Sequence, residues 1–248
     1  MNRMILTLAA AASVLSAAPL AAKPAEYARA VADTRRSEAN RKLDESRMPA
    51  AVLDFAGYKP GQTIADFMAG GGYYTELLSG VVGPKGRIYA TEPSVFYDAK
   101  VWQPLTKSHA NVATLVTPVA QMQLAPNSVD SVFAHLVYHD LYWESEKYKF
   151  TRVEPAAIAA NWFAAVRPGG TVVIVDHVGP AGDTRALVEK LHRIDPAQVK
   201  ADMAAAGFQL VAESDVLHRS DDTHTANVFD ASVRGKTDRF MLKFRRPA

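Results

Sequence analysis

Cysteine is absent from this chain of 248 residues. Its absence excludes disulfide bonds and cysteine-ligated metal centres, and an oxidising compartment tolerates such a chain well. Neither sign of charge is in excess, because 28 Lys and Arg against 26 Asp and Glu give a formal net charge of +2. This balance gives no general electrostatic reason to expect nucleic acid or an acidic membrane as a partner. With 48% apolar and 22% charged residues, the composition is typical of a soluble globular domain.

The first 22 residues have the pattern of an export signal. Arg3 supplies a positive charge, residues 4–18 are mostly apolar, and Leu20-Ala21-Ala22 offers small residues at a cleavage site before Lys23. The apolar stretch is shorter than the roughly 20 residues that a membrane span needs. We therefore predict a cleaved secretory signal over residues 1–22 and a periplasmic mature protein without stable membrane insertion. An uncleaved anchor is the alternative.

The rest of the chain divides into a short extension and one large domain. Residues 23–48 are helix-forming and mixed in charge, which usually indicates a solvated helix face. From residue 49 to residue 248, predicted strands alternate with predicted helices. The strands are expected at 63–67, 87–91, 112–116, 129–135, 171–176, 208–214 and 239–245, and the helices at 50–56, 73–81, 95–107, 154–166, 184–191 and 196–206. This order favours an α/β fold with parallel strands joined by right-handed crossovers.

A glycine-dense turn after the first predicted strand is the most informative stretch of the sequence. The strand ends at Asp66, and Gly70-Gly71-Gly72 leads into the predicted helix at Tyr73. Glycine lets a ligand approach the main chain closely. Glu92 ends the second strand 20 residues after Gly72 (92 − 72), where an acid is placed to accept hydrogen bonds from ribose hydroxyls. Together these features predict a nucleotide-binding corner, whereas a glycine run alone would also suit a surface loop.

These motifs resemble those of class I S-adenosylmethionine-dependent methyltransferases. Asp66-x-x-x-Gly70-x-Gly72 followed by Glu92 is similar to the first two motifs of that family, and residues 167–176 resemble its later turn and fifth strand. The similarity covers roughly residues 49–246. Within the family, the chain looks most like a branch of exported bacterial proteins with a similar Gly-Gly-Gly-Tyr-Tyr-Thr turn, a Tyr-His-Asp after the fourth strand and a Gly-Lys-Thr-Asp-Arg near the end.

The resemblance implies a Rossmann-like three-layer sandwich with a mostly parallel, seven-stranded sheet. It implies S-adenosyl-L-methionine as the cofactor and methyl transfer to a small-molecule acceptor. Asp66, Gly70 and Gly72 are expected to shape the methionine side of the cofactor pocket, and Glu92 is expected to hold the ribose. Tyr73 is expected to cover the cofactor, with packing in the core as the alternative.

Two pairs of polar residues follow neighbouring strands. His139-Asp140 comes after the fourth predicted strand, and Asp176-His177 after the fifth. Parallel sheets bind ligands beyond the carboxyl ends of their strands, and strands four and five flank the methyl acceptor in the family. We expect His139, with a pKa near neutral, to remove a proton from the acceptor. Asp140 and His177 are expected to assist it, whereas the structural alternative is that these residues only cap loops.

No metal site is predicted, although a looser site from His139, Asp140, Asp176 and His177 is an alternative that the spacing does not indicate. His135 and His139 are four residues apart, but their surroundings indicate a strand, where such a pair lies farther apart than on a helix. The long loop at 217–237 is expected to be a flap on the substrate side, because loops of that length tend to be functional or disordered. Residues 191–195 suit either a lid wall or a salt-linked turn.

Two other functions compete with methyl transfer. The first is an exported binding protein that keeps the fold without catalysis. It is favoured by Met68 in place of the first motif glycine, by the lack of an acid at 118–122, where many relatives contact the adenine, and by an export signal that removes the protein from cytoplasmic S-adenosylmethionine. The second is a nicotinamide-dependent oxidoreductase, against which stands Thr75 at the last position of the G-x-G-x-x-G pattern.

Overall fold

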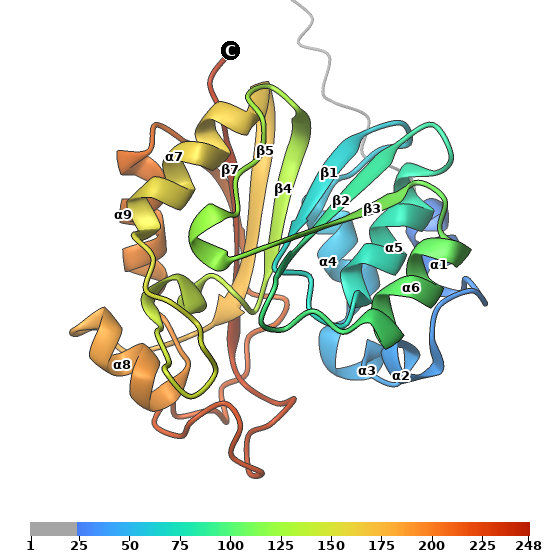
Figure 1. The fold of residues 1–248 in the computed structure, drawn as a ribbon. Coiled ribbons are helices and arrows are strands. Elements are labelled where there is room, and N and C mark those ends of the chain that lie inside the picture. The colour runs from blue at the N-terminus through green and yellow to red at the C-terminus, as the bar shows by residue number, and fades with distance from the viewer. Residues whose placement is uncertain (1–23) are drawn as a thin grey trace, which may run out of the picture.

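The computed structural model describes residues 24–248, so the predicted signal at 1–22 lies outside the described residues. Seven strands form one sheet in the order β3-β2-β1-β4-β5-β7-β6, which confirms the predicted fold class (Figure 1). The first five strands pair in parallel, and β7 is antiparallel to both β5 and β6. The strands are β1 (Thr63–Phe67), β2 (Arg87–Pro93), β3 (Val112–Thr117), β4 (Val129–His135), β5 (Val166–His177), β6 (Gln209–Ser214) and β7 (Arg239–Arg245).

Helices cover both faces of the sheet and make three layers (Figure 1). One group consists of α1 (Pro24–Val31), α2 (Glu38–Arg41), α3 (Asp44–Arg47), α4 (Pro49–Ala56), α5 (Tyr73–Val82) and α6 (Ala99–Ser108). The other group has α7 (Pro155–Ala165) and α9 (Pro196–Ala205), while α8 (Thr184–Leu191) lies at the edge of the sheet where β5 ends. Within the described residues, no helix has the length and apolar character needed to cross a membrane.

Alternation along the central strands divides the apolar core between the two faces. In β4, Val132 and Ala134 belong to the core beneath α7 and α9, whereas Phe133 belongs to the core beneath α4 and α5. Successive side chains of a strand point to opposite faces, so a strand covered on both sides is apolar throughout. The three consecutive apolar residues Val132, Phe133 and Ala134 therefore follow from the central place of β4 in the sheet.

The fifth strand begins earlier than predicted. We expected a turn at 167–170 and a strand from residue 171, but Val129 already pairs with Val166 before the register resumes at Ser131 and Thr171. Residues 167–170 thus bulge opposite Asp130. A side chain at Gly170 would bring its Cβ within 2.6 Å of the Asp130 carbonyl oxygen, so glycine is required where the bulge meets β4.

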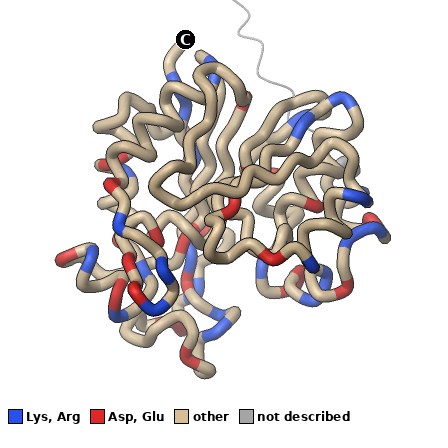
Figure 2. Tube along the Cα trace, in the orientation of Figure 1, with Lys and Arg blue, Asp and Glu red and all other residues tan. Residues whose placement is uncertain are grey.

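The carboxyl ends of β1, β2, β4 and β5 meet at one edge of the sheet, where the connecting loops and α8 gather (lower part of Figure 1). Acidic and basic residues are interspersed along the surrounding loops and helices rather than gathered by sign (Figure 2). The edge is also where the predicted site residues follow their strands, so the topology brings them to a common place.

Candidate functional site

The turn between β1 and α5 is held in a strained, fixed shape. Met68, Gly70 and Gly72 all have left-handed backbones, with φ of 50°, 57° and 73°. The N–H of Met68 donates to Thr91 Oγ1 at 3.1 Å, and the N–H of Gly70 donates to Glu92 Oε2 at 2.8 Å. A left-handed backbone costs a residue such as methionine roughly 1–2 kcal/mol. These two hydrogen bonds therefore hold the turn against the end of β2. Burial of the Met68 side chain offsets the free-energy cost of its left-handed backbone.

Two cavities flank this turn. One has a volume of about 360 Å³ and lies toward β2 and α6. Its lining residues are Met68, Gly70, Gly71, Glu92, Pro93, Phe96, Asp98, Val101, Trp102, Val137 and Asp140. The other has a volume of about 230 Å³ and is lined by residues from 40–47, 66–74 and 135–137. A Cβ added to Gly70 or Gly71 would meet no atom within 4 Å, so the turn leaves both cavities open.

A buried carboxylate lies on each cavity. Burial raises the pKa of Asp66 to about 7, although the hydrogen bond from Thr75 Oγ1 and the charge of Arg47 act in the opposite direction. Burial also raises the pKa of Glu92 to about 7, against the hydrogen bond from the N–H of Gly70. Each carboxylate thus lacks a strong cationic partner and favours a ligand that donates hydrogen bonds or carries positive charge.

Unpaired polar atoms complete the smaller cavity. The hydroxyl of Tyr74 and Nε2 of His135 are buried without a hydrogen-bond partner among the described residues, and both residues line this cavity. Their rings are in contact, with centroids 4.5 Å apart. Buried polar groups are usually satisfied, so these two atoms are available to a polar ligand.

The structure places four of the five predicted cofactor residues on the cavities. Asp66, Gly70, Tyr73 and Glu92 line one or both. Gly72 lines neither cavity. A Cβ added there would come within 2.3 Å of Leu105 Cδ1. Its glycine therefore makes room for α6 rather than for a ligand.

Sequence reasoning missed the contribution of the extension before residue 49. Asn40, Leu43 and Arg47 line the smaller cavity. The guanidinium of Arg47 lies over the ring of Tyr73, 4.4 Å from its centroid, and the Tyr73 hydroxyl donates to Asp44 Oδ1 at 2.7 Å. The mixed charges of this segment predicted a solvated face, but several of them pack against the first turn of α5. No local pattern marks such a long-range contact.

A third cavity, of about 470 Å³, lies beyond the ends of β4 and β5. It is lined by Phe96, Leu136, His139, Asp140, Trp143, Tyr148, His177, His192, Val228 and Phe229. Phe96 and Asp140 also line the 360 Å³ cavity, so the two cavities adjoin. All three residues predicted for catalysis, His139, Asp140 and His177, lie on this third cavity.

Asp176 fixes the orientation of His139 from below. Its fully buried carboxylate lies 2.8 Å from His139 Nδ1 and accepts hydrogen bonds from the backbone N–H groups of His139 and His177. The Nδ1 of His139 therefore carries a proton, and Nε2 points to Asp140 Oδ1 at 3.4 Å.

The pKa values of the two histidines at the strand ends are shifted in opposite directions. Burial lowers the pKa of His139, but the carboxylates of Asp176 and Asp140 outweigh it and raise the pKa to about 9. Burial lowers the pKa of His177 well below its usual value, and its Nδ1 lies 2.7 Å from Thr237 Oγ1. The near-neutral pKa expected for His139 is thus not what its surroundings give, because the sequence did not show that two carboxylates would flank one imidazole.

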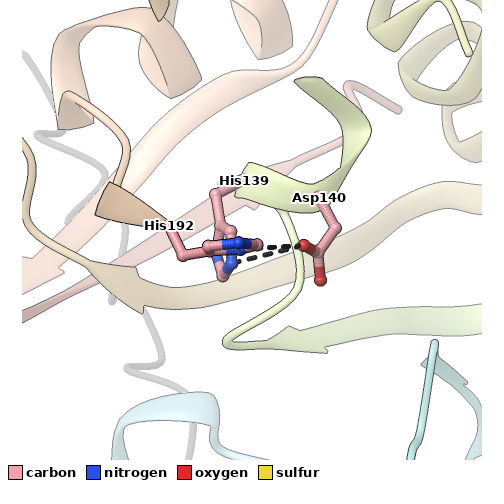
Figure 3. Close-up of side chains that lie close together, drawn as sticks. All are labelled: His139, Asp140 and His192. Atoms are coloured by element: carbon pink, nitrogen blue, oxygen red, sulfur yellow. Dashed lines mark ion pairs between the residues drawn. The ribbon is translucent and has the colours of Figure 1, made fainter. Parts of the chain in front are cut away.

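His192 joins this group from the end of α8. The sequence predicted a lid wall or a salt-linked turn at 191–195 but not the contact of His192 with Asp140. It caps the helix with a left-handed backbone at φ 50°. Its Nδ1 lies 3.8 Å from Asp140 Oδ1 and is buried without a hydrogen-bond partner among the described residues. The side chains of His139 and His192 converge on the same carboxylate oxygen (Figure 3). His135, by contrast, lines the 230 Å³ cavity instead.

The long loop at 217–237 supplies part of the third cavity, as the flap interpretation expects. Val228 and Phe229 lie on the cavity wall, and Phe229 packs its ring 5.0 Å from that of His192. A buried ion pair fastens the loop, with Arg193 Nη1 and Nη2 at 2.8 and 3.0 Å from the Asp222 carboxylate. Residues 191–195 therefore serve both as cavity wall and as the salt-linked turn.

Comparison with known proteins shows which domain and which folds this chain resembles. Residues 65–174 match the model of a methyltransferase domain. A methyltransferase dependent on S-adenosylmethionine from Aquifex aeolicus has a similar structure, with 20% identity, a TM-score of 0.60 and coverage of 90% of this chain and 98% of that one. Another from Mesorhizobium loti has 15% identity, a TM-score of 0.56 and coverage of 82% and 100%. No curated protein sequence matches the chain.

The same fold also serves another reaction. The [4+2]-cyclase SpnF is similar with 14% identity, a TM-score of 0.58 and coverage of 88% of this chain and 86% of that one. Structural likeness at this identity shows the fold alone, and function lies in the site built on it. The match over residues 65–174 supports a methyltransferase domain in that part of the chain.

Proposed function

We propose that the methyltransferase domain of this chain transfers the methyl group of S-adenosylmethionine to a small organic molecule bound beside His139. The observation that carries the proposal is the adjoining pair of cavities at the carboxyl edge of the sheet. One holds Glu92 and the open glycine turn, the other holds the histidines, and they share Phe96 and Asp140. Direct methyl transfer requires that donor and acceptor be held side by side.

The cofactor cavities suit the groups of S-adenosylmethionine. Glu92 offers carboxylate oxygens to ribose hydroxyls, and Asp66 lies on the cavity that would take the charged methionine part. The unpaired Tyr74 hydroxyl and His135 Nε2 are further polar partners. When bound, S-adenosylmethionine supplies an activated methyl group on a positively charged sulfur. The chain's own part is to bind the cofactor, orient it and exclude water.

The acceptor cavity combines an apolar rim with a polar floor. Phe96, Tyr148 and Phe229 are 42%, 49% and 60% exposed, so large apolar surfaces surround its mouth. Below them, His139 is held by Asp176, and His177 by Thr237. An acceptor with an apolar or aromatic body and one reactive heteroatom fits this arrangement, with His139 and Asp140 contacting the heteroatom.

Incubation with methyl-labelled S-adenosylmethionine and a panel of small aromatic and aliphatic acceptors tests this function. Transfer of label to an acceptor supports it. The rival interpretation, a binding protein without catalysis, predicts that native mass spectrometry finds retained S-adenosylmethionine or S-adenosylhomocysteine while no acceptor is labelled. A chain that retains neither compound and labels no acceptor would contradict the proposal.

Cofactor affinity is expected to fall as the pH is lowered through 7. The pKa of Glu92 is raised to about 7 in the folded protein, so below that pH the carboxyl is protonated and accepts hydrogen bonds poorly. From about pH 8 to about pH 6 the ionised fraction of such a group falls roughly tenfold, and calorimetry with S-adenosylhomocysteine should show a similar loss of affinity. Glu92→Gln should bind more weakly and lose the part of this pH dependence that Glu92 contributes, while Asp66, whose pKa is also raised to about 7, retains its own part. A pH-independent wild-type affinity would exclude the role given to Glu92.

We also propose that the protein is exported, on the pattern of Arg3, the apolar stretch at 4–18 and Ala22. Amino-terminal sequencing of the protein from a periplasmic extract is expected to start near Lys23. A chain that retains Met1 and is found only in the cytosol would contradict export.

A further inference from the structure

We propose that His139, Asp140 and His192 bind a divalent transition metal, best suited to zinc, on the wall of the 470 Å³ cavity. The site itself does not depend on methyl transfer, whereas the role given to the metal below rests on the proposed function. This proposal departs from the sequence-based prediction of no metal site, because His192 enters from a helix that the sequence does not connect with His139.

The three side chains have the spacing of metal ligands. One ligand atom from each lies within 4.8 Å of the others. Asp140 Oδ1 is 3.4 Å from His139 Nε2 and 3.8 Å from His192 Nδ1 (Figure 3). Bonds of about 2.0–2.2 Å in a tetrahedral site place ligand atoms roughly 3.3–3.6 Å apart. A metal ion can therefore be accommodated with only small movements of these side chains.

The hydrogen bonds behind His139 are those that a metal-bound imidazole uses. Its Nδ1 lies 2.8 Å from the Asp176 carboxylate, which leaves Nε2 facing the other two ligands. A carboxylate behind a ligating histidine fixes the tautomer and makes the imidazole a stronger ligand. Asp176 is itself held by two backbone N–H groups, so the support is rigid.

The state of His192 independently points to a ligand. Its Nδ1 is buried, faces Asp140 and has no hydrogen-bond partner among the described residues. A buried polar atom without a partner is costly, and coordination to a metal would satisfy it.

The donor set selects the class of metal. Two imidazoles and one carboxylate suit zinc and neighbouring transition metals, whereas magnesium and calcium prefer sites made of oxygen ligands. Three protein ligands leave a coordination position open, as in catalytic rather than structural zinc sites. All three residues line the 470 Å³ cavity, so an acceptor bound there would lie beside this site.

A metal at this place would activate the acceptor. When a hydroxyl or thiol of the acceptor binds the metal through its oxygen or sulfur, its pKa falls and its proton is released to solvent. The resulting anion attacks the methyl carbon of S-adenosylmethionine. The carbon–sulfur bond breaks with its electron pair remaining on sulfur, and the products are the methylated acceptor and S-adenosylhomocysteine.

Metal titration of the untagged chain tests the site without an activity assay. After dialysis against a chelator, wild type is expected to bind one Zn²⁺, and Co²⁺ is expected to give the visible absorption of a four- or five-coordinate site. His192→Asn, which retains a side chain suited to a left-handed backbone, should weaken Zn²⁺ binding at least tenfold. Asp176→Asn should weaken it about 10- to 100-fold through the loss of support behind His139.

His218→Asn is the matched control, because His218 is a largely exposed histidine that lies outside this cavity. It should bind Zn²⁺ as wild type does. Absence of Zn²⁺ binding by wild type, or wild-type affinity in His192→Asn with an unchanged melting temperature, would overturn the site. Metal binding without any labelled acceptor would uphold the site and count against methyl transfer. Label transfer that is unaffected by chelator would refute the role given to the metal.

Discussion

His139→Gln is expected to lower the turnover of methyl transfer by about 10²–10⁴. The imidazole lies on the acceptor cavity, not on the cavities beside the glycine turn. Its loss removes the group that contacts the reacting heteroatom, whether directly or as a metal ligand. Affinity for S-adenosylhomocysteine should therefore remain nearly unchanged. Turnover with the acceptor found by screening, and calorimetry with S-adenosylhomocysteine, measure the two effects separately.

The melting temperature separates catalysis from folding in this experiment. A purely structural His139 would give a lowered melting temperature with unchanged activity per folded molecule, which contradicts the assignment. His218→Gln provides the control, because this histidine is largely exposed and is not on the acceptor cavity. It should retain wild-type turnover.

Asp222→Ala is expected to lower the free energy of unfolding by about 3–5 kcal/mol, because it leaves a buried charge unpaired. Arg193 is fully buried, and the Asp222 carboxylate receives its Nη1 and Nη2 as well as the backbone N–H of Asp238. The Arg193 guanidinium also donates hydrogen bonds to the carbonyl oxygens of Val178 and Ala226, and these bonds limit the loss of stability. Urea unfolding measures the change.

Asp221→Ala is the matched control, one residue away but exposed. Surface substitutions usually change stability by no more than about 0.5 kcal/mol. If Asp222→Ala lowers the free energy of unfolding by less than about 1 kcal/mol, the attraction within the ion pair does little more than offset the cost of desolvating its two charges. If the pair anchors the loop, Asp222→Ala should also weaken acceptor binding, since Val228 and Phe229 lie on the same loop.

Local patterns were enough to predict the sheet and the cofactor turn. β1 and β4 are covered by helices on both faces, so consecutive residues in each strand are buried. Burial of consecutive residues can be recognised in the sequence as a short, mostly apolar segment. The predicted place of Glu92 beside the glycine turn follows from the parallel pairing of β1 with β2. Strand order at the carboxyl edge likewise brought His139 and Asp176 together, as their hydrogen bond confirms.

Features that depend on distant segments could not be predicted in this way. His192 reaches Asp140 only because α8 ends in a left-handed residue at the mouth of the cavity. Arg47 stacks on Tyr73, which is 26 residues later in the chain (73 − 47). The charge of Arg47 predicts a solvent-exposed side chain, but in the structure it lines a cavity. The glycine motif predicts that Gly72 contacts the cofactor. In the structure, Leu105 of α6 is the neighbour that leaves no room for a side chain at this position.

The stretch that matches the methyltransferase model, residues 65–174, contains the glycine turn, Glu92 and His139. Several cavity walls come from outside it, among them Arg47, His192 and Phe229. Of these residues, His192 and Phe229 line the third cavity and neither of the cavities beside the glycine turn, so substitutions at these two positions can alter the third cavity alone. Under the proposed function, relatives that share the inner stretch can therefore use the same methyl donor and still differ in which molecule receives the methyl group.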